Sequence, residues 1–158
     1  VCSLETTLAE AGAAMWDGDC GVLPILDETG RVLGVVTDRD LAIGAATKFR
    51  PAAEIAVREV SSANLYTCKP GDEVRDALKT IRQQGVRRLP VVDSQDKLQG
   101  LLSLNDIALA TVPERSAKPG DITYEDLALA MKAVCSRPTA RREEARKESM
   151  TLSPMKPG

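Results

Sequence analysis

Two short motifs place an aspartate three positions after a hydroxyl residue, Thr37-x-x-Asp40 and Ser103-x-x-Asp106. Each follows an apolar run and opens a helical pattern, so its side chains lie where a helix begins. Free backbone N–H groups and the positive end of the helix dipole favour an anion such as phosphate there. A carboxylate can accept both hydroxyl protons of a ribose, and a hydroxyl can bind a phosphate or sugar oxygen. The motifs therefore indicate ligand binding, because they assemble neither an activated nucleophile nor a tuned acid–base pair.

The same two motifs also have a purely structural explanation. A hydroxyl residue followed three positions later by an acid can form a capping box, which satisfies the free N–H groups at a helix start. Capping boxes favour the longer Glu or Gln at the third helical position, whereas both motifs carry Asp. That difference favours a ligand, but the capping interpretation stays open.

The motifs belong to a repeat with a constant offset of 66 residues. The segment 23–27 (LPILD) matches 89–93 (LPVVD), and 34–40 (GVVTDRD) matches 100–106 (GLLSLND). An internal repeat of this length decides the fold class before any local pattern does. Two copies predict a pseudo-symmetric pair, because a solenoid needs at least about three stacked repeats.

Each copy has the pattern of a short strand, a helix, two strands joined by a turn, and a second helix. Apolar residues at helical spacing predict the first helices, with Thr6 and Asp72 as their N-caps. The paired strands are expected at 22–26 with 32–36 and at 88–92 with 98–102, and the second helices at 38–46 and 104–110. Nearly continuous apolar runs at 32–36 and 98–102 indicate strands buried on both faces.

Composition excludes several classes of partner. The chain has 158 residues, 43% of them hydrophobic and 28% charged, which is typical of a globular protein. Only 3% are aromatic and the formal net charge is −2, so neither a stacking platform nor a basic surface for nucleic acid is expected. No apolar run approaches the roughly 20 residues that span a bilayer, and no signal-peptide pattern opens the chain. We therefore expect no nucleic-acid or membrane partner and a cytoplasmic location.

Metal and redox chemistry are not expected either. The chain contains no histidine, and its four cysteines form no Cys-x-x-Cys pair, so a zinc site is not predicted. Cys2 and Cys68 are equivalent in the two copies, and we interpret both as small apolar residues near a strand end. The absence of histidine also removes the commonest general base, and no enzymatic activity is expected.

The two copies resemble CBS domains, paired as a Bateman module. The resemblance covers about residues 1–112 and rests on Leu-Pro-[Ile/Val]-[Leu/Val]-Asp followed by Gly-x-x-[Thr/Ser]-x-x-Asp, in the family's order and spacing. It implies an α/β (α+β) fold of two tandem β-α-β-β-α units packed about a pseudo-twofold axis, to which this chain adds a C-terminal helix. Modules of this family are regulatory, bind adenosyl ligands and often pair into disc-shaped dimers.

The resemblance also implies a set of ligand-binding residues. Asp40 and Asp106 match the family's ribose-binding aspartates, and Thr37 and Ser103 match the neighbouring hydroxyl position. The opening strand of copy two matches the strand that lines the adenine pocket. Basic residues match a phosphate-binding place, although surface charge explains them equally well. These further candidates are Leu65, Tyr66, Thr67, Arg87, Arg88 and Arg39.

The copies differ at these positions, so their two sites are not expected to bind alike. Copy one has Gly21 in place of Arg87 and Val1 in place of Thr67, and so lacks the cation and the hydroxyl. One site is expected to be occupied and the other weak or empty. The expected ligand is an adenine nucleotide (AMP, ADP or ATP), and S-adenosylmethionine stays open because a cation-poor pocket tolerates its sulfonium.

The expected organisation has five parts: copy one at 1–48 with its first strand truncated, a connector at 49–62, copy two at 63–112, a helical extension at 113–136 and a disordered tail at 137–158. Within the extension, Thr123 and Asp126 resemble a short-armed capping box. Apolar spacing predicts a helix at 123–134 that uses Leu127, Ala130, Met131 and Val134. This helix could cap the module, exchange with a dimer mate or contact a target.

These observations predict a non-enzymatic regulatory module. It would bind an adenosyl ligand between the two copies and signal through their orientation or through the dimer state. We expect a homodimer and a regulated partner protein, which the sequence does not identify. Two alternatives stay open: a ligand-free dimerisation or interaction module, and a fragment of a larger Bateman-regulated enzyme or transporter.

Overall fold

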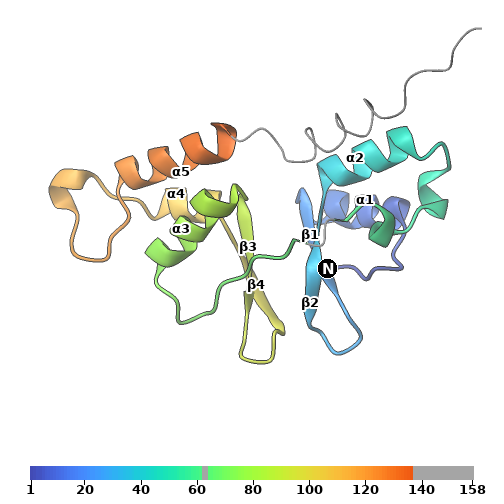
Figure 1. Ribbon diagram of the computed structural model, residues 1–158, viewed down its shortest axis with the longest axis horizontal. Helices are drawn as coiled ribbons and strands as arrows, with labels where there is room; N and C mark the ends of the chain where they lie inside the picture. Colours follow the sequence, from blue (N-terminus) through green and yellow to red (C-terminus); the bar gives the residue numbers. More distant parts are fainter. Residues whose placement is uncertain (62–63, 137–158) are drawn as a thin grey trace, which may run out of the picture. The chain divides into compact units, whose positions relative to one another are not determined.

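Each copy of the repeat folds into a two-stranded antiparallel hairpin that lies between two helices in the sequence (Figure 1). The computed structural model describes residues 1–61 and 64–136, so the tail predicted to be disordered at 137–158 lies outside the described residues. The elements are α1 (Leu8–Asp17), β1 (Val22–Leu26), β2 (Val32–Thr37), α2 (Asp38–Thr47), α3 (Val74–Gln84), β3 (Arg88–Val92), β4 (Leu98–Ser103), α4 (Leu104–Leu109) and α5 (Tyr124–Ser136). Short 3₁₀ helices cover Ala52–Glu54, Val57–Glu59 and Glu114–Ser116. The predicted mixed helix–strand class and the C-terminal helix are confirmed.

The two hairpins have the same register, as the repeat requires. Val22 pairs with Thr37 between β1 and β2, and Arg88 pairs with Ser103 between β3 and β4. Each hairpin also has one register irregularity at the equivalent place near its turn. The residue at the start of the first strand therefore always faces the residue that ends the second.

Both hairpin turns are held by an aspartate side chain. Asp27 Oδ1 accepts the backbone N–H of Arg31 at 3.0 Å, and Asp93 Oδ1 accepts the backbone N–H of Lys97 at 3.0 Å. An aspartate that bonds the backbone ahead of it favours a turn over continued strand. The Asp of each LPxxD motif is thus explained by the turn alone.

The two hairpins meet through repeat-equivalent residues, Arg31 and Lys97, which form an isolated antiparallel bridge. The residue after Arg31 donates its N–H to the carbonyl of the residue before Lys97 at 3.1 Å. The residue after Lys97 donates in turn to the carbonyl of the residue before Arg31 at 3.3 Å. Exchanging the copies exchanges these two bonds, so a local pseudo-twofold axis passes through the bridge.

The opening strand of each copy is only one bridge long. Cys2 pairs in parallel with β1 and donates to the carbonyl of Pro24 at 3.0 Å, and Cys68 donates to the carbonyl of Pro90 at 3.1 Å. Leu65, Tyr66 and Thr67 are the residues expected to form the opening strand of copy two, and this prediction is wrong, because the bridge to β3 is made by Cys68 instead. Burial raises the pKa of both thiols, which keeps them protonated and agrees with a small apolar role.

The first helix of each copy begins one residue later than predicted. Thr7, not Thr6, is the N-cap of α1, and it forms a reciprocal capping box with Glu10 (Thr7 N–H to Glu10 Oε2, 2.8 Å). In copy two Glu73 holds this place and makes no side-chain cap, while Asp72 Oδ2 accepts a backbone N–H from the preceding turn. Thr7 is preferred because Glu10 lies at the spacing that a capping box needs.

The prediction that the second strands are buried on both faces is wrong. Along β2 burial alternates, with Val36 fully buried and Leu33 42% exposed. Alternation of this kind is typical of a strand in an antiparallel hairpin that packs on helices with one face. A continuous apolar run in the sequence therefore does not predict whether one or both faces of the strand are buried.

The segment 49–62 supplies part of the hydrophobic core. Ile55 and Val57 are fully buried and Val60 is 8% exposed, all within the cluster built by α1, α2, β1 and β2. The segment also pairs with the chain before α1, because Leu8 N–H donates to Ile55 O at 2.9 Å and Val57 N–H donates to Thr6 O at 2.8 Å. Residues that connect the copies in sequence thus complete the core of the first one.

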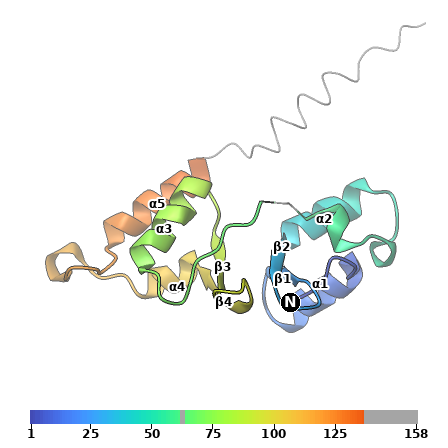
Figure 2. The same cartoon turned by 60° about the horizontal axis from the view of Figure 1, so that its bottom comes forward.

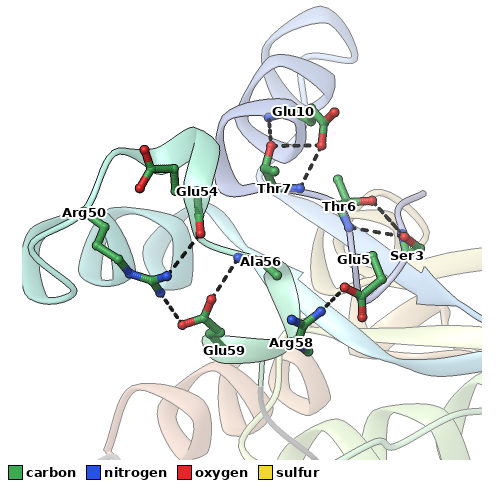
Figure 3. A network of polar contacts seen from close by, with 10 residues as sticks. All are labelled: Ser3, Glu5, Thr6, Thr7, Glu10, Arg50, Glu54, Ala56, Arg58 and Glu59. Atoms are coloured by element: carbon green, nitrogen blue, oxygen red, sulfur yellow. Dashed lines mark hydrogen bonds and ion pairs between the residues drawn. The ribbon is translucent and has the colours of Figure 1, made fainter.

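Charged side chains reinforce this segment from outside (Figure 3). Arg50 and Arg58 form ion pairs with Glu59 and Glu5, respectively. Glu59 also accepts the N–H of Ala56 at 3.2 Å, and this bond, with the nearby cations, holds the pKa of Glu59 below its usual value. The ion pairs are exposed and contribute little individually, so the buried residues of the segment provide its main attachment.

The chain divides into two compact units, and the division does not fall between the copies. The first unit contains 1–72 and 88–103, and the second contains 73–87 and the chain from 104 onward. In the first unit α1 and α2 pack on each other and on the β1–β2 hairpin (Figure 2). Both hairpins and the bridge between them also belong to the first unit.

In the second unit α3 and α5 run side by side (Figures 1 and 2). Arg75 on α3 pairs with Asp126 on α5 at 3.2 Å, and Asp126 forms the predicted capping box with Thr123. Ala130 is fully buried, but Met131 is 52% exposed and does not lie on the packed face as predicted. A helix at this place is confirmed, and within the chain it covers α3.

Candidate functional site

The first hydroxyl–aspartate motif lies at the junction of β2 and α2. Thr37 is the N-cap of α2, and its hydroxyl donates to Asp40 Oδ2 at 2.8 Å. Asp40 Oδ2 also accepts the Thr37 N–H at 3.2 Å, and the Asp40 N–H donates to Thr37 Oγ1 at 3.3 Å. These contacts form a complete capping box, so the structural interpretation of the motif is realised in copy one.

The same box occurs on a helix outside the repeat. Thr123 and Asp126 make the three equivalent contacts at 3.1–3.2 Å at the start of α5. The Thr123 N–H, with help from Arg75, holds the pKa of Asp126 below its usual range. The shorter Asp side chain thus closes a capping box, and the expectation that Asp disfavours one is wrong. A Thr-x-x-Asp motif by itself is not a ligand signature.

The second motif has a cation beside it. Ser103 ends β4 and faces Arg88 directly in the antiparallel register. Side chains of such directly opposed residues start about 4.5–5.5 Å apart at Cβ. Arg88 is half-buried, and the backbone carbonyl of Arg87 accepts the N–H of Leu104, the first residue of α4, at 3.0 Å. Both predicted arginines therefore lie at the strand–helix junction that carries Ser103, and Asp106 follows in the first turn of α4.

The corresponding junction in copy one has the opposite charge. The Asp38 N–H donates to the carbonyl of Gly21 at 3.2 Å, as Leu104 does to Arg87. A Cβ atom added to Gly21 would lie 2.9 Å from Asp38 Oδ2. The Asp38 carboxylate therefore fills the space that a side chain at position 21, the equivalent of Arg87, would need. Arg39 follows on α2 and is exposed. Copy one thus presents two aspartates and one arginine at its junction, and copy two presents two arginines and one aspartate.

A pocket of about 410 Å³ lies in the first unit, away from these junction residues. It is lined by two of the three residues expected to contact adenine, Leu65 and Thr67, whereas Tyr66 is half-buried and does not line it. The other lining residues are Asp27, Arg31, Val32, Leu33, Val92 and Asp96. The structure therefore brings two of the residues expected to contact adenine into one pocket with residues of the two hairpins.

No sequence pattern indicated the charged residues that line this pocket. Asp27 was recognisable only as a turn residue, because it ends an LPxxD motif. Arg31 and Asp96 come together through the bridge between the hairpins, which depends on how the copies pair and not on any local pattern. Repeat symmetry could have suggested that equivalent turns meet, but not that they enclose a pocket.

Among residues 1–61 and 64–136 no group of three or more Cys, Asp or Glu side chains is arranged to hold a metal ion. No helix in that part of the chain is long and apolar enough to cross a bilayer.

The dependence of stability on pH follows from the perturbed groups. The Thr29 hydroxyl lowers the pKa of Asp27 and the Gln95 N–H lowers the pKa of Asp93, so their contribution exists above about pH 4 and is lost below it. Burial raises the pKa of the two strand-end thiols, so their contribution is lost as the pH rises above about 8.5.

We therefore expect a melting temperature that is flat from about pH 5 to 8 and falls on both sides. Thermal unfolding monitored by circular dichroism across this range tests it. The Asp27→Asn/Asp93→Asn double variant should have a shallower acid limb. A step near pH 6.5, where histidine titrates, would contradict the expectation, because the chain has none.

Comparison with known proteins gives consistent matches. The CBS domain family model matches residues 1–44 and 57–112. The CBS domain-containing protein YhcV of Bacillus subtilis is 33% identical over 115 residues, covering 73% of this chain and 80% of that protein. An uncharacterised protein of Methanopyrus kandleri is 30% identical, covering 71% of this chain and 60% of its own length. Inosine-5′-monophosphate dehydrogenase of Mycobacterium tuberculosis is 29% identical, and the match covers 76% of this chain but 22% of the enzyme.

Solved structures share the fold at lower identity. The CBS domain pair of protein MJ0100, in complex with 5′-methylthioadenosine and S-adenosyl-L-methionine, has a TM-score of 0.62 at 22% identity and covers 69% of this chain and 85% of its own. A protein of Burkholderia ambifaria described as a signal-transduction protein with CBS domains has a TM-score of 0.64 at 23% identity, over 75% and 85% of the two chains. With the family model matching most of its described residues in two copies, this chain belongs to the CBS domain family.

Proposed function

We propose that the chain is a non-enzymatic regulatory module whose two CBS copies bind adenosyl ligands and transmit occupancy to a partner protein. The observation that carries the proposal is the register of the β3–β4 hairpin, which sets Arg88 opposite Ser103 at the start of α4. A cation, a hydroxyl and a helix start with a carboxylate in its first turn are the groups that a nucleoside phosphate needs.

Copy two is the phosphate-binding copy in this proposal. Arg88 is half-buried, so its charge is less screened than that of a freely exposed side chain. Arginine binds phosphate through paired N–H groups, and the Ser103 hydroxyl can donate to a phosphate or sugar oxygen. Asp106, in the first turn of α4, then accepts the ribose hydroxyls. AMP, ADP and ATP are the ligand class for this copy.

Copy one favours a ligand without phosphate. Asp38 and Asp40 flank the start of α2, and no arginine occupies the place of Gly21. A phosphate brought to two carboxylates is repelled, whereas a neutral nucleoside or a sulfonium cation is not. S-adenosylmethionine or a thioadenosine therefore fits this copy better than AMP. The MJ0100 domain pair, which carries 5′-methylthioadenosine and S-adenosyl-L-methionine, supports this class of ligand by similarity of fold.

Signalling follows from differential binding. A ligand shifts the orientation of the copies, or the dimer state, only by the difference in its affinity for the two arrangements. The proposal includes a homodimer, a regulated protein as partner, and a reducing, cytoplasmic environment suited to the four free cysteines. The match to 22% of a dehydrogenase supports the idea that a module of this kind can form part of a larger enzyme.

A thermal-shift panel with AMP, ADP, ATP, S-adenosylmethionine and adenosine tests the proposal. A ligand at about ten times its dissociation constant stabilises by roughly 1.4 kcal/mol, which raises the melting temperature by about 3–6 °C. The Asp40→Ala/Asp106→Ala double variant should lose these shifts. Asp126→Ala is the matched control, because it removes the same kind of capping box outside the repeat and should keep them.

The competing function is a ligand-free interaction module in which the motifs serve only as caps. The complete capping box at Thr37 and Asp40 favours this candidate. It predicts that both the double variant and Asp126→Ala lose about 0.5–2 kcal/mol per cap. It also predicts no ligand shift in the unaltered chain up to millimolar concentration, and that result would overturn the nucleotide proposal.

A further inference from the structure

Helix α5 has a second apolar face besides the one that packs on α3. Ala130 is fully buried in the second unit, and Asp126 on the same side pairs with Arg75 of α3. Four exposed residues follow a different line along the helix at spacings of four, three and four, namely Tyr124, Ala128, Met131 and Cys135. Tyr124 is 54% exposed and Met131 is 52% exposed. This spacing is that of the a and d positions of a coiled coil, and we call these four residues the α5 seam.

The α5 seam has a size pattern that suits one arrangement. If a second α5 packs on it in the opposite direction, Tyr124 faces Cys135 of the other copy and Ala128 faces Met131 of the other copy. Each layer then joins a large residue to a small one, which fills space evenly. In a parallel arrangement each residue would face itself, and the Ala128 layer would leave a gap between two methyl groups.

Charges beside the seam select the same arrangement. Glu125 and Lys132 are both exposed and flank the seam on one side at equivalent heptad positions. In an antiparallel pair, residues at these equivalent positions of the two helices approach each other, so Glu125 of each copy meets Lys132 of the other. Flanking charges of this kind set partner choice and orientation in coiled coils. In a parallel pair Lys132 would face Leu127 of the other copy instead, and Glu125 would meet no residue of α5.

We propose that α5 is a self-association surface, on which α5 of a second copy of this chain packs antiparallel through the α5 seam. A helix of 13 residues is about 20 Å long, and its seam buries less than the roughly 1,200 Å² of a stable interface. The resulting dimer is therefore transient and its population depends on protein concentration. This surface lies outside the two CBS copies and does not depend on the proposed ligand.

Sedimentation velocity of the full chain over a concentration series tests the surface. Ala128→Glu places two like charges in the middle of the seam and should raise the dissociation constant of the α5 contact at least tenfold. Leu129→Glu is the matched control, because Leu129 is 44% exposed on the same helix but points away from the seam, and it should change that constant less than twofold. Glu125→Lys should weaken association, and the Glu125→Lys/Lys132→Glu exchange should restore it.

Disulfide trapping reports the direction of the helices. In a Cys20→Ser background, Tyr124→Cys should give a covalent dimer on mild oxidation through Cys135 of the other copy, and the background alone should not. Efficient cross-linking of the background through Cys135 alone would mean a parallel pair and would overturn the proposal. So would equal association of Ala128→Glu and Leu129→Glu, since the seam would then be covered by another part of the chain. Circular dichroism confirms that each variant keeps its helices.

Discussion

The Arg88→Ala variant is expected to bind AMP about 10- to 100-fold more weakly than the unaltered chain. A hydrogen bond to a charged group contributes about 1.5–3 kcal/mol, and Arg88 is the cation that the hairpin register sets beside Ser103. Arg88→Lys should recover only part of the loss, because lysine keeps the charge but not the paired N–H geometry. Isothermal titration calorimetry at constant salt measures both.

Adenosine provides the control for this prediction. It has no phosphate, so Arg88→Ala should change its affinity less than twofold. Arg39→Ala, which removes the arginine of the copy-one junction, should leave AMP binding unchanged. An equal loss for AMP and adenosine would show that Arg88 supports the hairpin and not the phosphate, and would shift the phosphate site elsewhere on the chain.

The Ile55→Ala variant is expected to lose about 2–5 kcal/mol of unfolding free energy, the largest single stability effect predicted for the segment 49–62. Ile55 is fully buried in the core cluster of the first copy, and its carbonyl accepts the N–H of Leu8 at the start of α1. Deleting three of its carbons leaves a cavity among side chains that cannot all relax. Urea unfolding followed by circular dichroism gives the value.

Ile43→Ala makes the same chemical change where the side chain is 44% exposed on α2, and it should cost under about 1 kcal/mol. Similar losses in the two variants would show that the segment 49–62 is a loose connector and not part of the core. The expected difference would show that a fragment ending near residue 48 lacks an essential part of its fold.

The repeat allowed most elements to be predicted, because each element had two independent examples. Both hairpins and the second helices were found where the apolar spacing and the turn residues indicate, and α5, which lies outside the repeat, was found from its apolar spacing alone. The N-caps were misplaced by one residue, since Thr6 and Thr7 are equally good caps until the partner Glu10 is considered. The one-sided burial of β2 could not be predicted, because an apolar run does not say how many layers cover it.

The sequence places the candidate residues on their elements but does not predict the contacts that they make. The position of Thr37 and Asp40 at a helix start is confirmed, yet the sequence could not decide between a cap and a ligand, and the two use the same atoms. To predict that Arg88 lies opposite Ser103 requires the strand register, which is fixed by the turn. To predict that the Asp38 carboxylate lies beside Gly21 requires the path of the backbone, since the two residues are distant in sequence.

The bridge between Arg31 and Lys97 has the form of a contact between two identical molecules, because each half offers the other the same pair of backbone groups. Two separate chains carrying one copy each could join in this way, but symmetry would then force their binding ends to be the same. Placing both copies on one chain replaces that encounter with an internal one, at an effective concentration of about millimolar. The two copies then pair without having to be identical, and Gly21 and Arg87 are free to differ. A single polypeptide can thus carry two chemically different strand–helix junctions on one duplicated fold.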